Sequence, residues 1–125
     1  MFEGSILSIL VWLPILLGAQ TPGVLGSWKG KLNVGGAQLT MVYHIKQNDA
    51  GSLTATADSP DQGAYGMAVE NVSYTDGKLQ LQMLSMGAVF EGKMQSNDLI
   101  SGVFTQRGTN FDMELRRSGE VQRPQ

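Results

Sequence analysis

The stretch that decides the fold is QLTMVYHIK, residues 38–46, in which apolar and polar side chains alternate. Successive side chains of a β-strand point to opposite faces, so a period of two predicts a half-buried strand. One face of this strand would carry Leu39, Met41, Tyr43 and Ile45. The chain's single histidine, His44, falls on the opposite face together with Thr40 and Val42.

The same alternation recurs after residue 20, and clusters of Gly, Asn, Asp and Ser interrupt it at short intervals. Asp76-Gly77 is the strongest hairpin signal, because a two-residue type I′ turn requires positive φ at both central positions. The pattern predicts about eight strands, near residues 26–34, 38–47, 52–58, 67–74, 78–84, 88–95, 99–106 and 111–117.

Short strands joined by tight turns imply antiparallel neighbours, and an open sheet of this size would leave two unpaired edges. Closing the sheet removes both edges, so we predict an all-β fold, an antiparallel up-and-down β-barrel, with a sandwich as the alternative. Such a barrel either holds one small ligand or is filled by its own side chains. The glycines and alanines on the strands favour a cavity. The expected interior contains Leu39, Met41, Tyr43, Leu53, Leu81, Met83, Phe90, Phe104, Phe111 and Met113.

The N-terminus carries the apolar run ILSILVWLPILL, residues 6–17, followed by the small residues Gly18 and Ala19. The run is shorter than the roughly 20 residues of a membrane-spanning helix and resembles the core of a secretory signal. We predict a signal peptide over residues 1–19, a barrel domain over 20–118 and a flexible tail over 119–125. The expected location is secreted or periplasmic, with membrane contact only through the signal segment.

The amino-acid composition excludes some kinds of functional site and argues against others. The chain has no cysteine, which excludes disulfides, thiolate catalysis and thiolate metal ligands. Its nine basic and eleven acidic residues give a formal charge of −2, and the sequence shows no concentrated basic run that would favour a nucleic acid. A single histidine without cysteine argues against zinc, and no spaced Asp loop points to calcium. We therefore expect no metal, no cofactor and no nucleic acid.

The segment ADSPDQGAYG, residues 57–66, admits a catalytic and a structural interpretation. In the catalytic one, Ser59 is a nucleophile, His44 its base, and Asp58 or Asp61 orients the imidazole. No Gly-x-Ser-x-Gly elbow supports this arrangement. In the structural one, Asp58 accepts backbone amides, Pro60 fixes φ and Gly63 adopts positive φ, which makes a compact reversal at the barrel rim.

Gly26-Ser27-Trp28 resembles the Gly-x-Trp that opens the first strand of lipocalin-like (calycin) proteins. In that superfamily, the tryptophan closes one end of the barrel, and a basic residue of the last strand packs across it. Arg117 is in phase with Phe111, Met113 and Leu115 and is the expected partner. The resemblance implies that Gly26, Trp28 and Arg117 are structural.

A second resemblance covers nearly all of the chain after the signal. The segments GSWKGKL, LTMVYHI, GSLTATADSPDQGAYGMAVENV, GAVFEGKM, ISGVFTQ and MELRR are similar to the N-terminal accessory domain of secreted bacterial α/β-hydrolases of the serine aminopeptidase and esterase type. EVQRPQ, residues 120–125, is similar to the start of the linker that follows that domain. The resemblance implies a non-catalytic role beside a hydrolase, because the catalytic serine of such proteins lies in the later domain.

The resulting hypotheses are an exported binding or accessory domain for substrate or a hydrolase partner, a free-standing carrier of a small apolar ligand, and a small hydrolase using His44. No catalytic residue is assigned. A ligand would contact residues of the barrel interior or rim, which are expected to be Met41, Tyr43, Asp58, Asp61, Gln62, Tyr65, Met83, Phe90 and Phe104.

Overall fold

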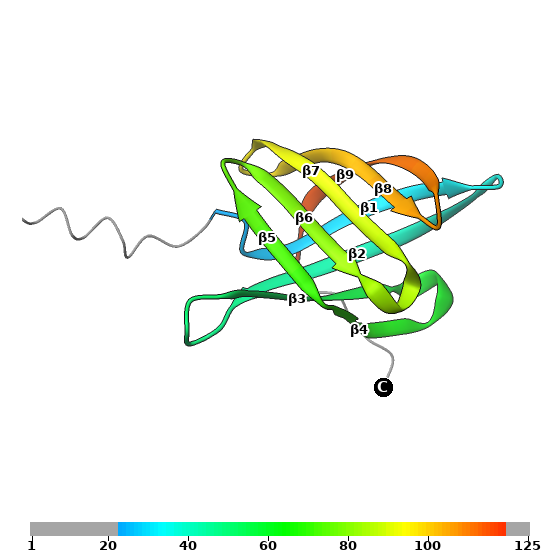
Figure 1. Cartoon of the computed structure of the whole chain (residues 1–125). Coiled ribbons are helices and arrows are strands. Elements are labelled where there is room, and N and C mark those ends of the chain that lie inside the picture. The colour runs from blue at the N-terminus through cyan, green and yellow to red at the C-terminus, as the bar shows by residue number, and fades with distance from the viewer. Residues whose placement is uncertain (1–22, 120–125) are drawn as a thin grey trace, which may run out of the picture.

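The computed structural model describes residues 23–119, which form one nine-stranded antiparallel sheet (Figure 1). The strands are β1 (Gly26–Val34), β2 (Ala37–Gln47), β3 (Leu53–Ser59), β4 (Ala64–Val69), β5 (Asn71–Thr75), β6 (Lys78–Met83), β7 (Ala88–Ser96), β8 (Leu99–Gln106) and β9 (Thr109–Ser118). Two short 3₁₀ helices, η2 (Pro60–Gln62) and η3 (Leu84–Met86), connect β3 to β4 and β6 to β7.

The sheet curls into a nearly closed barrel. Its strand order is β4-β3-β2-β1-β9-β8-β7-β6-β5, so the first and last strands of the chain are neighbours in the middle of the sheet. Trp28 pairs with Arg117 and Lys29 with Arg116 across that junction. The two edge strands, β4 and β5, are consecutive in the chain, and β5 approaches β3 at the remaining seam. The predicted all-β antiparallel barrel is confirmed.

The strand expected near residues 67–74 divides into β4 and β5 at Glu70, which makes nine strands where about eight were predicted. β4 pairs with β3, whereas β5 pairs with β6, so the chain changes partner between Val69 and Asn71. The Glu70 carboxylate turns to a different element and accepts the backbone N–H of Leu84 at 2.9 Å. The inward phase shifts by one residue at this point, because Met67 and Val69 pack toward the core on β4, whereas Val72 and Tyr74 do so on β5. The sequence shows this break in alternation, and the single strand predicted over residues 67–74 missed it.

The predicted turns adopt the expected backbone conformations. Asp76 and Gly77 both have positive φ, at 53° and 79°, as a type I′ hairpin turn requires. Gly63 ends η2 in the left-handed region, with φ of 66°. The DSPDQG segment is therefore a compact reversal between β3 and β4, as the structural interpretation predicted.

The inward side chains form one contiguous core. A void large enough for water would leave accessible area on the side chains around it, yet the central ones are at most 3% exposed. They are Trp28, Leu32, Met41, Tyr43, Ile45, Leu79, Leu81, Met83, Phe90, Ile100, Phe104, Met113 and Leu115. Tyr43 and Phe90, from opposite halves of the sheet, have ring centroids 6.3 Å apart. The middle of the barrel is occupied by its own side chains.

Two of the strand glycines from which the sequence predicted a cavity lie against the ring of Phe90. Gly92 and Gly102 are paired across β7 and β8. A Cβ on Gly92 would lie 2.6 Å from the Phe90 Cζ, and one on Gly102 would lie 2.2 Å from the Glu91 carbonyl oxygen. The missing side chains thus make room for the Phe90 ring and for close approach of the two strands, without leaving a cavity there.

Trp28 and Arg117 pack against each other where β1 begins and β9 ends. The fully buried Trp28 donates its indole N–H to the Val24 carbonyl at 2.8 Å, and the Arg117 guanidinium carbon lies 4.3 Å from the ring centre. The guanidinium also donates to the carbonyls of Asn97 at 2.6 Å and Leu25 at 2.7 Å, and to that of Gly23. The expected cation–π contact is confirmed in its geometry.

The predicted signal peptide lies outside the described residues, as does all of the predicted tail except Gly119. Within residues 23–119, no helix is long and apolar enough to cross a membrane. The secreted or periplasmic location stays a prediction.

Candidate functional site

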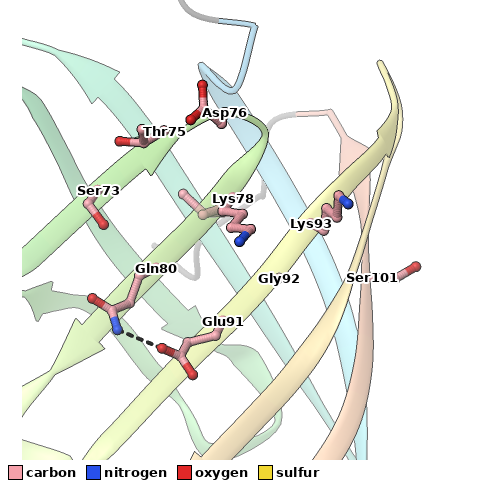
Figure 2. Close-up of a pocket in the computed structure, with 10 residues that line it drawn as sticks. Ser73, Thr75, Asp76, Lys78, Gln80, Glu91, Gly92, Lys93 and Ser101 are labelled. Carbon is pink, nitrogen blue, oxygen red and sulfur yellow. Dashed lines mark hydrogen bonds between the residues drawn. The ribbon is translucent and has the colours of Figure 1, made fainter.

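A polar groove of about 690 Å³ runs across the outer face of β5 to β8 (Figure 2). The alternation of β6 creates it, because Leu79 and Leu81 point into the core and leave Lys78 and Gln80 outside. Its polar lining consists of Ser73, Thr75, Asp76, Lys78, Gln80, Glu91, Lys93 and Ser101. We call this surface the β5–β8 groove.

Strand register arranges the groove in two rows. In one row, Ser73 faces Gln80, which faces Glu91. The Gln80 side-chain amide donates to the Glu91 carboxylate at 2.8 Å, the bond drawn as a dashed line in Figure 2. This row offers hydroxyl, amide and carboxylate groups, which can both donate and accept hydrogen bonds.

The second row of the β5–β8 groove is charged. Thr75 faces Lys78, Lys78 faces Lys93, and Lys93 faces Ser101. Directly opposed side chains on one face of a sheet are close neighbours, so the two ammonium groups add a local positive charge beside the neutral and acidic row. A groove with several convergent polar groups and this volume is suited to a small polar ligand or a segment of a partner.

A second constellation, on the outer face of β1 to β3, joins Ser27, His44 and Asp58. The Ser27 hydroxyl lies 2.7 Å from His44 Nδ1, and His44 Nε2 lies 2.8 Å from an Asp58 carboxylate oxygen. The other Asp58 oxygen accepts the backbone N–H of Gly66 at 2.8 Å. Asp58 is completely buried, while the His44 side chain is 16% exposed. We call this set the Ser27–His44–Asp58 cluster.

One assignment of the protons fits both contacts of His44. With an ionised Asp58 and a neutral imidazole, Nε2–H donates to Asp58, and Nδ1 accepts the Ser27 hydroxyl proton. This is the order of hydrogen bonds that activates a serine in hydrolases. A hollow of about 100 Å³ beside His44 is lined by residues of β2 and β3 and does not include Ser27. The cluster has hydrolase-like bonding, but this hollow is smaller than the roughly 300–1,000 Å³ of usual small-molecule sites.

Of the predicted Ser59–His44–Asp triad, the contact between His44 and Asp58 is present, but the serine bonded to His44 is Ser27. His44 does meet Asp58, but Ser59 accepts the side-chain amide of Gln62 at 2.9 Å. The other candidate acid, Asp61, accepts the backbone N–H of Thr40 at 2.7 Å. Asp58, Asp61 and Gln62 therefore fasten the reversal between β3 and β4.

Sequence reasoning missed Ser27, although a signal for it was present. Gly35-Gly36 forms the turn between β1 and β2, and counting outward from this turn pairs Val34 with Ala37 and then Ser27 with His44. A hairpin register worked out from the predicted turn would have placed the hydroxyl beside the imidazole.

The residues predicted to contact a ligand fall into two groups. Met41, Tyr43, Met83, Phe90 and Phe104 lie in the packed core. The other four lie at and after the end of β3, with Asp58 on β3, Asp61 and Gln62 in η2 and Tyr65 at the start of β4. Burial raises the pKa of the Tyr43 phenol above its ordinary value, so this hydroxyl stays protonated. Ligand contact by either group stays a prediction.

Among residues 23–119, no group of three or more His, Cys, Asp or Glu side chains could hold a metal ion. Comparison of the chain with protein-family models, curated proteins and solved structures gives no match. What defines the class of this protein is therefore its own architecture: an antiparallel β-barrel with a filled core and polar grooves on its outer face.

Proposed function

We propose that this chain is an exported, non-catalytic binding domain that works beside a secreted α/β-hydrolase and holds a substrate or the hydrolase itself in the β5–β8 groove. One observation carries the choice of surface. The central core side chains are at most 3% exposed, whereas a groove of about 690 Å³ with hydrogen-bonding groups is open on the outside. The partner and the export are supported by the sequence resemblance and the apolar N-terminal run.

The alternative of a carrier for an apolar ligand finds less support. A ligand inside the barrel would have to displace Tyr43 or Phe90, which are both completely buried and whose ring centroids are 6.3 Å apart. Separating close-packed side chains costs the contacts they make, and close packing leaves no volume for a guest. Binding on the outer face requires no such rearrangement.

Deletion of the gene tests the proposed function. The secreted esterase activity of the producing cells, measured on p-nitrophenyl butyrate, is expected to fall when the chain is absent and to return when it is supplied. A Ser101→Trp variant, which places a bulky ring on the β8 side of the groove, is expected not to restore the activity. Gln38→Trp, at the exposed start of β2 and outside the groove, is the matched control and is expected to restore it.

Two results would contradict the proposal. Unchanged esterase activity in the deletion strain removes the link to a hydrolase. Full restoration by Ser101→Trp, with circular dichroism equal to that of the original protein, removes the β5–β8 groove from the binding surface.

The Ser27–His44–Asp58 cluster favours a second candidate, weak ester hydrolysis by the barrel itself. General base and nucleophilic catalysis of this kind contributes about 10²–10⁴-fold. If the cluster is catalytic, purified protein turns over p-nitrophenyl acetate, and Ser27→Ala and His44→Ala each lower the rate by about 10²-fold or more. The binding-domain proposal predicts instead that the original protein and Ser27→Ala have equal rates, close to the rate in buffer.

A further inference from the structure

The β1–β9 junction concentrates positive charge on a protein whose overall charge is slightly negative. Lys29, Lys31, Arg116 and Arg117 are four of the chain's nine basic residues, and they line one outer hollow of about 430 Å³. Among the described residues of that lining, Glu114 is the only acidic one. We call this the β1–β9 hollow. It is separate from the β5–β8 groove, because the two linings share no residue.

The fold brings these charges together from opposite ends of the chain. Lys29 on β1 lies directly opposite Arg116 on β9, and the β1–β9 ladder ends at that pair. Lys31 is two residues further along β1 and therefore on the same face. Because like charges directly opposite each other destabilise a sheet, the arrangement has an energetic cost that a bound anion would offset.

Little within the described part of the chain neutralises the hollow. Arg116 contacts the Glu114 carboxylate at 3.2 Å, but both side chains are more than half exposed, and such surface pairs contribute little. Within residues 23–119, the one acidic partner of Arg117 is Asp98, at 3.8 Å, and the donors of Arg117 are used by backbone carbonyls that leave its charge in place. No ion pair among residues 23–119 includes Lys29 or Lys31.

We propose that the β1–β9 hollow binds a single phosphate or sulfate group of a small ligand, with Lys29, Lys31 and Arg116 as its donors. Guanidinium and ammonium groups make short charge-assisted hydrogen bonds to such oxyanions, and an arginine can engage two oxygens at once. The Glu114 contact is weak enough to be exchanged for the ligand. The volume matches small-molecule sites, which span about 300–1,000 Å³. This site is independent of the function proposed for the β5–β8 groove.

Titration of the ¹⁵N-labelled protein with inorganic phosphate at pH 7.5 and low salt tests the site. Amide shifts are expected at Lys29, Lys31 and Arg116. Lys29→Gln and Lys31→Gln should each weaken binding about fivefold and the double variant at least tenfold. Lys46→Gln removes one positive charge from the outer face of β2, outside the hollow, and should leave the dissociation constant unchanged.

Thermal unfolding gives a second readout, because the lysines are expected to lower Tm without phosphate and to raise it when phosphate is bound. Without phosphate, Lys29→Gln is expected to raise Tm by about 2 °C, because it removes the repulsion from Arg116. With phosphate, the Tm of the original protein rises through binding to the folded state, whereas the Tm of the double variant does not.

Glycerol phosphate and vesicles of phosphatidylcholine with phosphatidylglycerol identify the source of the group. Binding of glycerol phosphate alone indicates a soluble ligand, and lysine-dependent binding of both indicates that a lipid headgroup also fits. Three results would overturn the site: no shifts with phosphate, equal shifts in the double variant, or binding to vesicles without binding to either soluble phosphate. None of them affects the complementation test of the β5–β8 groove.

Discussion

Replacing Trp28 by alanine is expected to lower the free energy of unfolding by about 3–5 kcal/mol, the usual cost of removing a large aromatic side chain from a core. The indole is completely buried, donates to the Val24 carbonyl at 2.8 Å, and lies beneath the Arg117 guanidinium. Its loss leaves a void in the core and removes the ring on which Arg117 packs. Urea unfolding followed by circular dichroism measures the change.

Two further variants identify the cause of the Trp28 effect. Trp28→Phe keeps most of the buried area and loses the hydrogen bond, so its effect should be about 1–2 kcal/mol. Val34→Ala, at the exposed end of β1, should stay within about 0.5 kcal/mol of the original protein. A Trp28→Ala effect as small as that of Val34→Ala would show that this end of the barrel does not depend on the indole.

Asp58→Ala is expected to lower the free energy of unfolding by about 3 kcal/mol, because it leaves a buried amide and an imidazole without their acceptor. Asp58 is completely buried and binds both His44 Nε2 and the Gly66 N–H at 2.8 Å. The change also leaves a void beneath the β3–β4 reversal. Equilibrium urea unfolding at pH 7 measures the effect.

Asp61→Ala is the matched control for Asp58→Ala. Asp61 accepts one backbone N–H, that of Thr40 at 2.7 Å, and lies in an exposed position where water can replace the carboxylate. Its removal should cost less than about 1 kcal/mol. Equal effects of the two substitutions would mean that the burial of Asp58 and its bond to His44 do not stabilise the barrel.

Much of the barrel is predictable from local signals. The period of two in QLTMVYHIK assigns the faces of β2 correctly, with Met41, Tyr43 and Ile45 in the core. Asp76-Gly77 and Gly63 adopt the positive φ values that their residue types favour. These features depend on the geometry of a few consecutive residues, so the sequence contains the information needed to predict them.

What could not be predicted depends on residues far apart in the chain. The change of partner at Glu70 is set by which strands lie beside β4 and β5. The alternation shifts phase between Val69 and Val72, but this shift does not say which strand each half pairs with. The β1–β9 hollow needs the pairing of Lys29 with Arg116, the first strand with the last. Charge that is dispersed along the sequence is gathered only when the barrel closes.

The filled core also changes which part of the fold is expected to bind. Methionines and strand glycines are compatible with a cavity. In the structure, however, the Phe90 ring lies against Gly92 and Gly102, and its centroid is 6.3 Å from that of the Tyr43 ring. The apolar residues therefore stabilise the barrel, and the polar residues on its outer face remain available to a ligand or partner. This division of roles separates the binding-domain proposal from the carrier hypothesis.

Native mass spectrometry of the protein, purified without denaturation, tests most directly whether the barrel is filled by its own side chains. We expect a mass equal to that of the polypeptide alone, unchanged after denaturation and extraction with organic solvent. A bound apolar mass that leaves only on denaturation would contradict the filled core and would make this chain a carrier.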